Sequence, residues 1–299
     1  MANKVFMSGA GGRLGRAVFQ RTGAVPLVRR PSGLSGEIVT DFSAGQLKGI
    51  LKDARIFIHA AGSVDTLDKK GLWESNLALT RRIVAALPKG CRLIFASSIS
   101  VYGKLLAEVP ADEGTPVNPD SEYARSKYES ERAVSALPDH VILRIGTIYG
   151  PEFQDYFRIF RRLEQGRMKI IGDGQNRIPF VHVEDVAEAF RNALERGSGV
   201  YVIAGDPLTQ KRIYEIASRE LGVDPPSGTV ERRSAVLLAA FGEILHRFGG
   251  KRPPLTREHV AVLAYDRAFD CSKARKELGF SPRPLEKGIR EMVSDYKRN

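Results

Sequence analysis

Short apolar runs alternate with stretches of helical periodicity through the first half of the chain. The runs that predict buried strands are residues 5–7, 25–28, 55–59, 92–96 and 141–145. The stretches that predict helices, with apolar residues every three or four positions, are 14–20, 44–51, 72–87 and 122–136. This repeated strand–helix–strand spacing predicts an α/β fold with a doubly wound parallel sheet covered by helices on both faces.

The second half of the chain is less regular. Its predicted helices are residues 153–165, 183–195, 211–221 and 234–248. A predicted strand at 200–203 would return to the sheet, so we expect residues 178–206 to complete an N-terminal domain formed by residues 1–148. The remaining residues, 149–177 and 207–299, would form a smaller C-terminal region.

Composition narrows the class of protein. With 299 residues, 42% of them hydrophobic, the chain can bury a large core. The longest apolar stretch, 235–241, is much shorter than the ~20 residues of a membrane span, and no signal peptide precedes the first strand. Cys91 and Cys271 lie far apart without metal-ligand spacing, so we expect no disulfide framework and no metal site. A cytoplasmic protein without a membrane span is the resulting expectation.

The chain is strongly basic, with a net charge of +11. Such a surplus attracts nucleic acid or anionic small molecules. The basic residues are spread over both halves, mixed with acidic residues, and form no basic tail. We therefore expect a small-molecule partner, with anionic compounds included, and no nucleic acid.

Three glycines follow the first predicted strand at intervals of three. Gly9, Gly12 and Gly15 lie in the segment SGAGGRLG, which passes directly into a predicted helix. Glycine allows a tight turn there, and the helix N-terminus behind it points backbone N–H groups at a pyrophosphate. The sequence therefore predicts a Rossmann-type dinucleotide site that includes these glycines, Arg13 and Leu14.

The end of the second predicted strand indicates which dinucleotide binds. NAD sites usually carry an acidic residue there, about 20 residues beyond the glycines, for the ribose 2′-hydroxyl. This strand ends in Arg29 and Arg30, and no Asp or Glu lies between Gly15 and Glu37. Arg29, helped by Arg30 or Arg13, could pair with a 2′-phosphate. NADP(H) is therefore favoured, with NAD(H) as the alternative.

A tyrosine and a lysine on one predicted helix could together transfer a proton. Tyr123 and Lys127 are four residues apart, so their side chains lie on one helix face about one turn from each other. A free phenol has a pKa of ~10, and a neighbouring cation brings that pKa toward the working range. Ser98 would end a sheet strand at the edge where such sheets bind ligands, and its hydroxyl can donate to a substrate oxygen.

Together these motifs resemble the extended short-chain dehydrogenase/reductase family, which includes NAD-dependent epimerases and dehydratases. Further similarities are Asp41-Phe42, the strand end His59-Ala60-Ala61-Gly62, Asn76, and the segments 143–151, 180–187 and 269–280. The resemblance implies that Asp41 and Phe42 contact the adenine. It also implies that Ala60, Ala61 and Gly62 lie along the cofactor, and that Asn76 is structural. We interpret His59 as structural too.

The same resemblance implies a catalytic triad of Ser98, Tyr123 and Lys127, the last two also contacting the cofactor. The implied reaction is hydride transfer between NAD(P)(H) and a secondary alcohol or ketone, with Tyr123 as the base in the oxidation direction. Two alternatives stay open. One is a nucleotide-sugar epimerase, such as a 4-epimerase, with tightly bound NAD, and the other is a non-catalytic, cofactor-sensing protein on the same fold. A homodimer through the helices at 72–87 and 122–136 is also implied.

The substrate is the least determined part of this interpretation. Candidate contacts are Ser63, Ser98 and Thr147. Nucleotide-sugar enzymes often have asparagine where Thr147 stands, and an arginine one position later than Arg177. The apolar segment 234–248 is similar to a region of steroid- and flavonol-type reductases and could wall a pocket for an apolar alcohol or ketone. A core helix or a dimer contact are the other interpretations of that segment.

Overall fold

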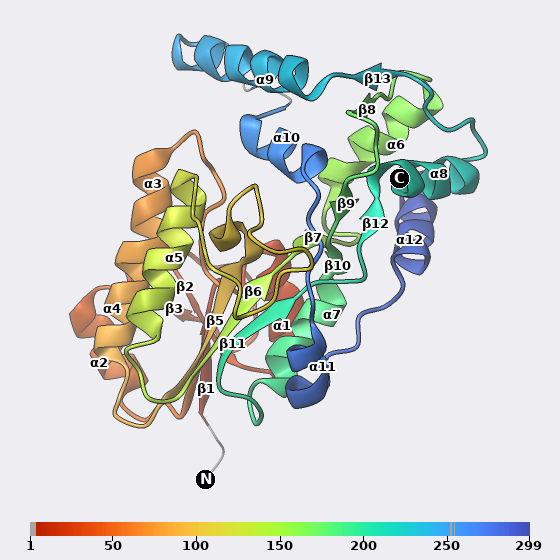
Figure 1. Ribbon diagram of the computed structural model, residues 1–299. Coiled ribbons are helices and arrows are strands. Elements are labelled where there is room, and N and C mark those ends of the chain that lie inside the picture. The colour runs from red at the N-terminus through yellow and green to blue at the C-terminus, as the bar shows by residue number, and fades with distance from the viewer. Residues whose placement is uncertain (1–3, 252, 254) are drawn as a thin grey trace.

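A computed structural model describes residues 4–251, 253 and 255–299, and within these ranges seven strands form one parallel sheet (Figure 1). The strands are β1 (Val5–Ser8), β2 (Val25–Val28), β3 (Ile38–Val39), β4 (Ile56–His59), β5 (Arg92–Ser98), β6 (His140–Ile145) and β11 (Gly199–Ile203). Their order across the sheet is β11-β6-β5-β4-β1-β2-β3, and neighbouring strands pair in parallel. The predicted Rossmann-type α/β fold is confirmed.

Helices cover both faces of this sheet (Figure 1). One face carries α2 (Ala44–Leu51), α3 (Lys69–Trp73), α4 (Leu79–Ala86) and α5 (Glu122–Val134), and the other carries α1 (Arg13–Thr22), α7 (Val183–Asn192) and α11 (Ser272–Leu278). Chain order changes direction between β1 and β4, which is where sheets of this type bind ligands, beyond the carboxyl ends of the strands.

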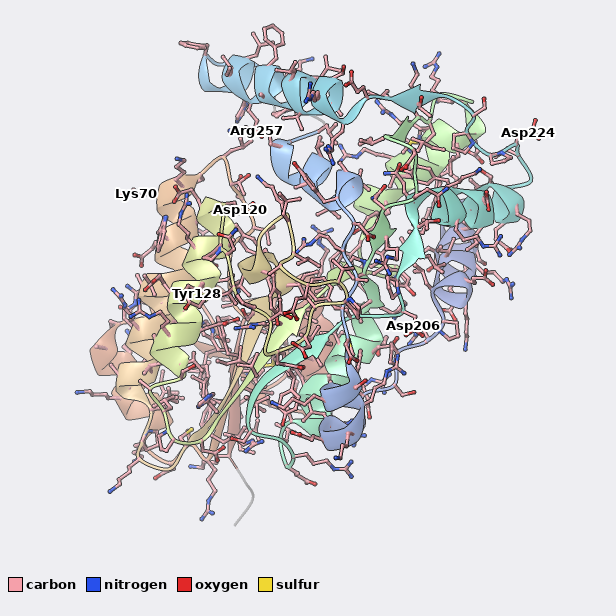
Figure 2. The ribbon with its side chains drawn as sticks, in the orientation of Figure 1. Lys70, Asp120, Tyr128, Asp206, Asp224 and Arg257 are labelled. Carbon is pink, nitrogen blue, oxygen red and sulfur yellow. The ribbon has the colours of Figure 1, made fainter. Side chains whose placement is uncertain are left out.

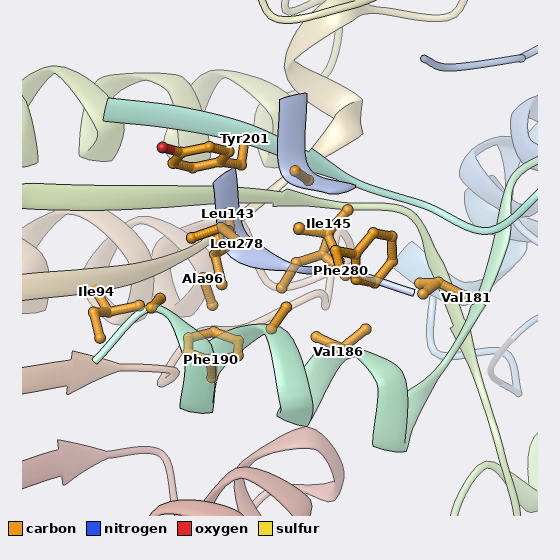
Figure 3. Packing of buried hydrophobic residues seen from close by; sticks show 14 of the residues in the cluster. Ile94, Ala96, Leu143, Ile145, Val181, Val186, Phe190, Tyr201, Leu278 and Phe280 are labelled. Carbon is orange, nitrogen blue, oxygen red and sulfur yellow. The ribbon is translucent and has the colours of Figure 1, made fainter. Parts of the chain in front are cut away.

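Alternate strand residues build the core beneath α7. Ala96 and Leu143, from neighbouring strands, lie against Phe190 and Val186 of α7 (Figure 3). Successive side chains of a strand point to opposite faces of the sheet. The residues next to Ala96 and Leu143 along their strands therefore contribute to the core on the α2, α4 and α5 side. The two cores fix the sheet in position between its helices.

One predicted helix, at residues 72–87, is interrupted. It consists of α3, a π-helical turn at Glu74–Ala78, and α4. The carbonyl oxygen of Asn76 accepts hydrogen bonds from the hydroxyls of Thr80 (2.5 Å) and Ser130 (3.1 Å), which stabilises the irregular turn. Turns of this kind often occur at functional sites, and apolar periodicity does not report them.

The parts of the second half that do not join the sheet or its covering helices form a smaller body above the carboxyl edge of the sheet (Figure 1). Its helices are α6 (Phe157–Glu164), α8 (Gln210–Leu221), α9 (Arg232–Arg247), α10 (Arg257–Ala264) and α12 (Leu285–Arg298). A 3-10 turn at Gln154–Tyr156 directly precedes α6, and another, at Ile99–Tyr102, follows β5 of the sheet. Its short strands are β7 (Thr147–Tyr149), β8 (Ile170–Ile171), β9 (Arg177–Ile178), β10 (Phe180–His182), β12 (Leu208–Thr209) and β13 (Thr229–Val230).

This smaller body has apolar cores of its own. Side chains of α6, α8 and α12 form one core, and α9 packs on α10 through a second, small one. The helices α10, α11 and α12 lie outside the predicted set, and the predicted helix at 153–165 begins only at Phe157. None of the helices in the described ranges combines the length and the apolar character that crossing a bilayer requires.

Candidate active site and cofactor pocket

The glycine turn between β1 and α1 has no room for a side chain at Gly9 or at Gly15. Gly9 has a φ of +84°, and a Cβ built on it would lie 2.4 Å from the backbone nitrogen of Ala61. A Cβ on Gly15 would lie 1.8 Å from the carbonyl oxygen of Gly9. Gly12 caps α1 without a side-chain hydrogen bond, so the first N–H groups of the helix are available to an anion. The turn therefore fits a pyrophosphate.

A pocket of about 370 Å³ opens beside this turn. Eight predicted cofactor residues line it: Gly9, Gly12, Arg29, Arg30, Phe42, Ala60, Ala61 and Gly62. The sequence analysis missed its other lining residues, among them Ser32, Ser75 and Leu79. Leu14 and Gly15 pack behind the turn, and Asp41 holds the backbone N–H of Ser43 (2.7 Å), so these three are outside the pocket lining.

Phe42, which the resemblance places against the adenine, has an unusual backbone conformation in the lining of this pocket. Its φ is +60°, a left-handed conformation that is rare for a bulky side chain. The hydroxyl of Thr40 accepts a hydrogen bond from the Phe42 N–H (3.1 Å), and the Arg29 guanidinium lies 5.9 Å from the ring centroid. Such strain costs about 1–3 kcal/mol and is concentrated at ligand sites.

The arginines predicted to select NADP are separated in the structure. Arg29 and Arg30 are exposed at the pocket, whereas Arg13 forms an ion pair with Asp155 (2.7 Å) and lines a different cleft. Glu37, the first acidic residue after the glycines, accepts hydrogen bonds from the Ser32 hydroxyl (2.6 Å) and from backbone N–H groups, which lower its pKa. Glu37 thus shapes the loop and does not line the pocket.

A second cleft, of about 720 Å³, is lined by two of the three predicted catalytic residues, and Lys127 is not part of its lining. Ser98, Tyr123 and Thr147 all line it. Ser98 ends β5, and its hydroxyl caps the following 3-10 turn by accepting from the N–H of Ser100 (3.2 Å). The hydroxyl of Ser121 caps α5 by accepting from the N–H of Ala124 (3.2 Å), so Tyr123 is in the first turn of α5. These two caps start both elements at the edge of the cleft.

Lys127 lies one turn further along α5, almost completely buried. Its ammonium donates to the carbonyl oxygen of Ala96 (2.8 Å) and lies 5.1 Å from the ring centroid of Phe95. Burial lowers the pKa of Lys127 to about 8, against the opposing charge of Glu131. A Cβ on Gly62 would lie 3.0 Å from the Lys127 nitrogen. Lys127 therefore borders the strand end that lines the cofactor pocket.

Asn76 holds the loop beside this lysine. Its amide oxygen accepts from the N–H of Ser63 (2.8 Å), and its amide nitrogen donates to the Ser63 carbonyl (3.0 Å) and the Ser126 hydroxyl (2.8 Å). Ser63 is thus fixed as part of the loop and does not line the cleft, although residues 64–67 do. The structural interpretation of Asn76 agrees with these contacts.

His59 is fully buried between two hydroxyls. Its ring nitrogens lie 2.8 Å from the hydroxyl of Ser8 and 2.8 Å from that of Thr80. Burial, together with the charge of Lys127, lowers the pKa of His59 to about 3. The ring therefore stays neutral and has a structural role, as interpreted from the sequence.

Several cleft residues carry no sequence motif and were missed. Arg158 comes from α6, Thr256 and Val262 from the α10 region, and Arg267 from the segment that follows. The Arg267 guanidinium donates to the carbonyl oxygen of Ile99 (2.8 Å), in the 3-10 turn after Ser98. The sequence around Arg158 indicates only an exposed basic position on an amphipathic helix, and this does not reveal which helices meet at the cleft.

The buried charge of Lys127 makes a prediction about stability and pH. Its ordinary pKa of 10.5 is lowered to about 8 on folding, so between these values the unfolded chain binds more protons and stability rises with pH. Relative to Lys127→Met, the free energy of unfolding of the wild type should increase by roughly 3 kcal/mol across this interval. Urea unfolding of both proteins at several pH values measures the difference, and a flat difference would contradict the lowered pKa.

Comparisons with known proteins agree with this geometry. A sequence model described as the NAD dependent epimerase/dehydratase family matches residues 38–204, more than half of the chain. The 2-alkyl-3-oxoalkanoate reductase of Stenotrophomonas maltophilia is 27% identical over 97% of this chain and 98% of the reductase. The 3beta-hydroxysteroid-dehydrogenase/decarboxylase isoform 1 of Arabidopsis thaliana is 27% identical over 95% of this chain and 69% of that protein.

Solved structures of similar proteins also match the chain over almost its whole length. The crystal structure of gox2253 matches with a TM-score of 0.78 and 28% identity over 99% of this chain and 98% of that one. MoeE5 in complex with UDP-glucose and NAD matches with a TM-score of 0.73 and 25% identity over 99% of both chains. As the sequence predicts, the chain belongs to the NAD dependent epimerase/dehydratase family of extended short-chain dehydrogenases/reductases, and it is an enzyme of that family, either an oxidoreductase or an epimerase.

Proposed function

We propose that the protein is a reductase or dehydrogenase that interconverts a ketone and a secondary alcohol, with a preference for NADP(H). The observation that carries this proposal is that Ser98 and Tyr123 line one cleft, with Lys127 one helical turn behind Tyr123. The adjoining pocket has the glycine turn that a dinucleotide needs. Residues 149–177 and 207–299 would supply the substrate side of the cleft, because Arg158, Thr256 and Val262 line it from there.

The protein groups would handle the oxygen end of the reaction. A bound nicotinamide supplies or accepts the hydride. In reduction, the Tyr123 hydroxyl would give its proton to the substrate oxygen, while the Ser98 hydroxyl donates a hydrogen bond that stabilises the developing negative charge. The Lys127 ammonium would stabilise the charge left on the Tyr123 oxygen.

The cleft favours a substrate that has an apolar body and an anionic group. Its lining combines apolar side chains, such as Leu67, Ile99 and Val262, with charged ones. Four of these are basic and three acidic: Arg13, Lys104, Arg158 and Arg267, and Asp65, Asp120 and Asp155, with Arg13 paired to Asp155. A 3-oxo acid with alkyl chains has this chemistry, and the reductase of Stenotrophomonas maltophilia is named for one. We therefore propose 3-oxo acids and related apolar ketones as the substrate class.

A nucleotide-sugar epimerase is the second candidate, because MoeE5 is 25% identical and its structure contains UDP-glucose and NAD. The position of Arg177 argues against it here. The Arg177 guanidinium forms two hydrogen bonds to the carboxylate of Asp266 (2.7 and 2.9 Å) and is outside the cleft lining. The Arg177 guanidinium therefore already has a carboxylate partner and is not presented to the cleft.

A substrate panel separates the two candidates. Long-chain 3-oxo acids, neutral apolar ketones and UDP-sugars are each incubated with the enzyme, and NADPH absorbance and product stereochemistry are followed. We expect NADPH consumption with the apolar ketones and inversion of none of the UDP-sugars. Epimerisation of a UDP-sugar without net cofactor consumption would establish the second candidate instead.

The NADP preference predicts a selective effect of Arg29→Ala. A lost charge-assisted hydrogen bond to the 2′-phosphate should raise KM for NADPH about tenfold or more and leave KM for NADH within about twofold. Steady-state kinetics with both cofactors measures this. Arg16→Ala, an exposed arginine of α1 outside the pocket lining, is the control. Equal changes for the two cofactors would contradict the assignment of Arg29.

A further inference from the structure

The helix α9 turns its small side chains toward the protein and its large apolar side chains toward solvent, which is the opposite of an ordinary surface helix. Small side chains, Ala235 and Ala239, face inward and pack on α10. Large apolar side chains face outward and are between 49% and 87% exposed: Leu237, Leu238, Phe241, Ile244, Leu245 and Phe248, the last directly after the helix. We call these six residues the outer face of α9. Surface helices normally bury their large apolar residues.

The outer face of α9 is one continuous stripe. Leu237, Phe241, Ile244, Leu245 and Phe248 follow the three- and four-residue spacing of a single helix face. Figure 1 shows α9 at the end of the molecule opposite the N-terminus, extending past α10. A contiguous exposed apolar patch of this kind marks an interaction site.

Charges around the stripe indicate what covers it. Arg232 and Arg233 are exposed at the start of α9, and Lys251 is exposed beyond its end, with Glu231 as the exposed acid beside them. Glu243 faces the inner side, where its carboxylate pairs with Arg257 (2.9 Å). A second copy of this chain would bring basic helix ends together in either orientation, which is unfavourable. An anionic surface matches them.

We propose that the outer face of α9 binds the surface of an anionic lipid bilayer, with the helix lying in the interface. Apolar side chains would enter the acyl boundary while Arg233 and Lys251 contact the headgroups. The Arg232 guanidinium lies over the Tyr265 ring, 5.1 Å from its centroid. The helix would lie on the membrane and not cross it. This inference goes beyond the proposed reaction and does not depend on it.

Membrane binding would also bring the cleft close to the lipid. On the inner side of the same helix pair, Glu243, His246 and Arg257 line an opening that adjoins the catalytic cleft, and Val262 of α10 lines the cleft itself. Figure 2 shows Arg257 on this side of the opening and Asp120 on the sheet side.

Co-sedimentation of the full chain with vesicles tests the proposal. The wild type should bind vesicles of equal parts phosphatidylglycerol and phosphatidylcholine, more weakly at high salt, and bind pure phosphatidylcholine poorly. The variant Leu237→Gln/Phe241→Gln/Leu245→Gln should need at least about tenfold more lipid for half-maximal binding. Val39→Gln, at an exposed apolar residue of the edge strand β3, should bind as the wild type does. Far-UV circular dichroism checks folding.

A second variant tests the electrostatic part without touching the apolar stripe. Arg233→Gln/Lys251→Gln should reduce binding to the anionic vesicles and flatten its salt dependence. Absence of vesicle binding by the wild type would overturn the proposal, and so would binding that both variants retain in full. Analytical ultracentrifugation tests the remaining alternative. If the wild type is a dimer, the triple variant is a monomer and neither binds vesicles, the outer face of α9 is covered by a second copy and the membrane proposal is overturned.

Discussion

Replacing Tyr123 with phenylalanine is expected to lower kcat by about 10²- to 10⁴-fold. The substitution removes one hydroxyl group from the first turn of α5, where Tyr123 and Ser98 line the same cleft. If Tyr123 exchanges the proton with the substrate oxygen, nothing else in the variant replaces that step at the same place. Steady-state kinetics with the best ketone of the substrate panel measures the effect.

The same substitution should leave cofactor affinity nearly unchanged. Tyr123 is outside the lining of the smaller pocket, so a fluorescence titration with NADPH should give a Kd within about threefold of the wild type. Tyr128→Phe is the matched control on the same helix (Figure 2), because Tyr128 packs against the core and is absent from the cleft lining. Undiminished turnover by Tyr123→Phe, or an equal loss in Tyr128→Phe, would contradict the proposed mechanism.

The sheet and the cofactor end could be predicted from sequence because local rules determine them. Gly9 and Gly15 have no space for a Cβ, so the turn leaves a glycine pattern that can be read directly. Strands buried on both faces are continuous apolar runs, so they can be told from the helices between them in the sequence. The order of the strands was not predicted, since no local pattern states which strands are neighbours.

The substrate side could not be predicted in the same way. Arg158 and Arg267 are more than 100 residues apart in sequence, and only tertiary packing brings them to one cleft. Arg13 shows the opposite case. Its position in the glycine motif suggested the cofactor, yet the partner of its guanidinium is Asp155, in the second half of the chain. Contacts of this kind depend on how the smaller body sits on the sheet.

Glutamine in place of Glu131 is expected to destabilise the protein by about 3–5 kcal/mol, a large part of the total stability of a typical domain. Glu131 and Arg144 form a buried ion pair (2.8 Å), with 4% and 8% of their side chains exposed. The Ser97 hydroxyl donates to the same carboxylate (2.5 Å), and Arg144 donates to the Tyr102 oxygen (2.9 Å). Removing the negative charge leaves the Arg144 guanidinium buried without its counter-ion.

Two further variants, one at an exposed ion pair and one that removes both buried charges, separate the effect of the uncompensated Arg144 charge from the simple loss of a hydrogen bond. Glu129→Gln breaks the Arg132–Glu129 pair on the same helix, which lies in solvent, and should cost no more than about 0.5 kcal/mol. Glu131→Gln/Arg144→Met removes both charges and should be more stable than Glu131→Gln alone, because no uncompensated charge stays buried. Urea unfolding at neutral pH measures all three variants. A loss below about 1 kcal/mol in Glu131→Gln, or a double variant less stable than the single one, would show that the buried charge is not what makes Glu131 necessary. The negative charge of Glu131 also raises the pKa of Lys127, against the effect of burial. In Glu131→Gln the pKa of Lys127 should therefore be lower still, and the rise of stability with pH that Lys127 causes should begin at a lower pH.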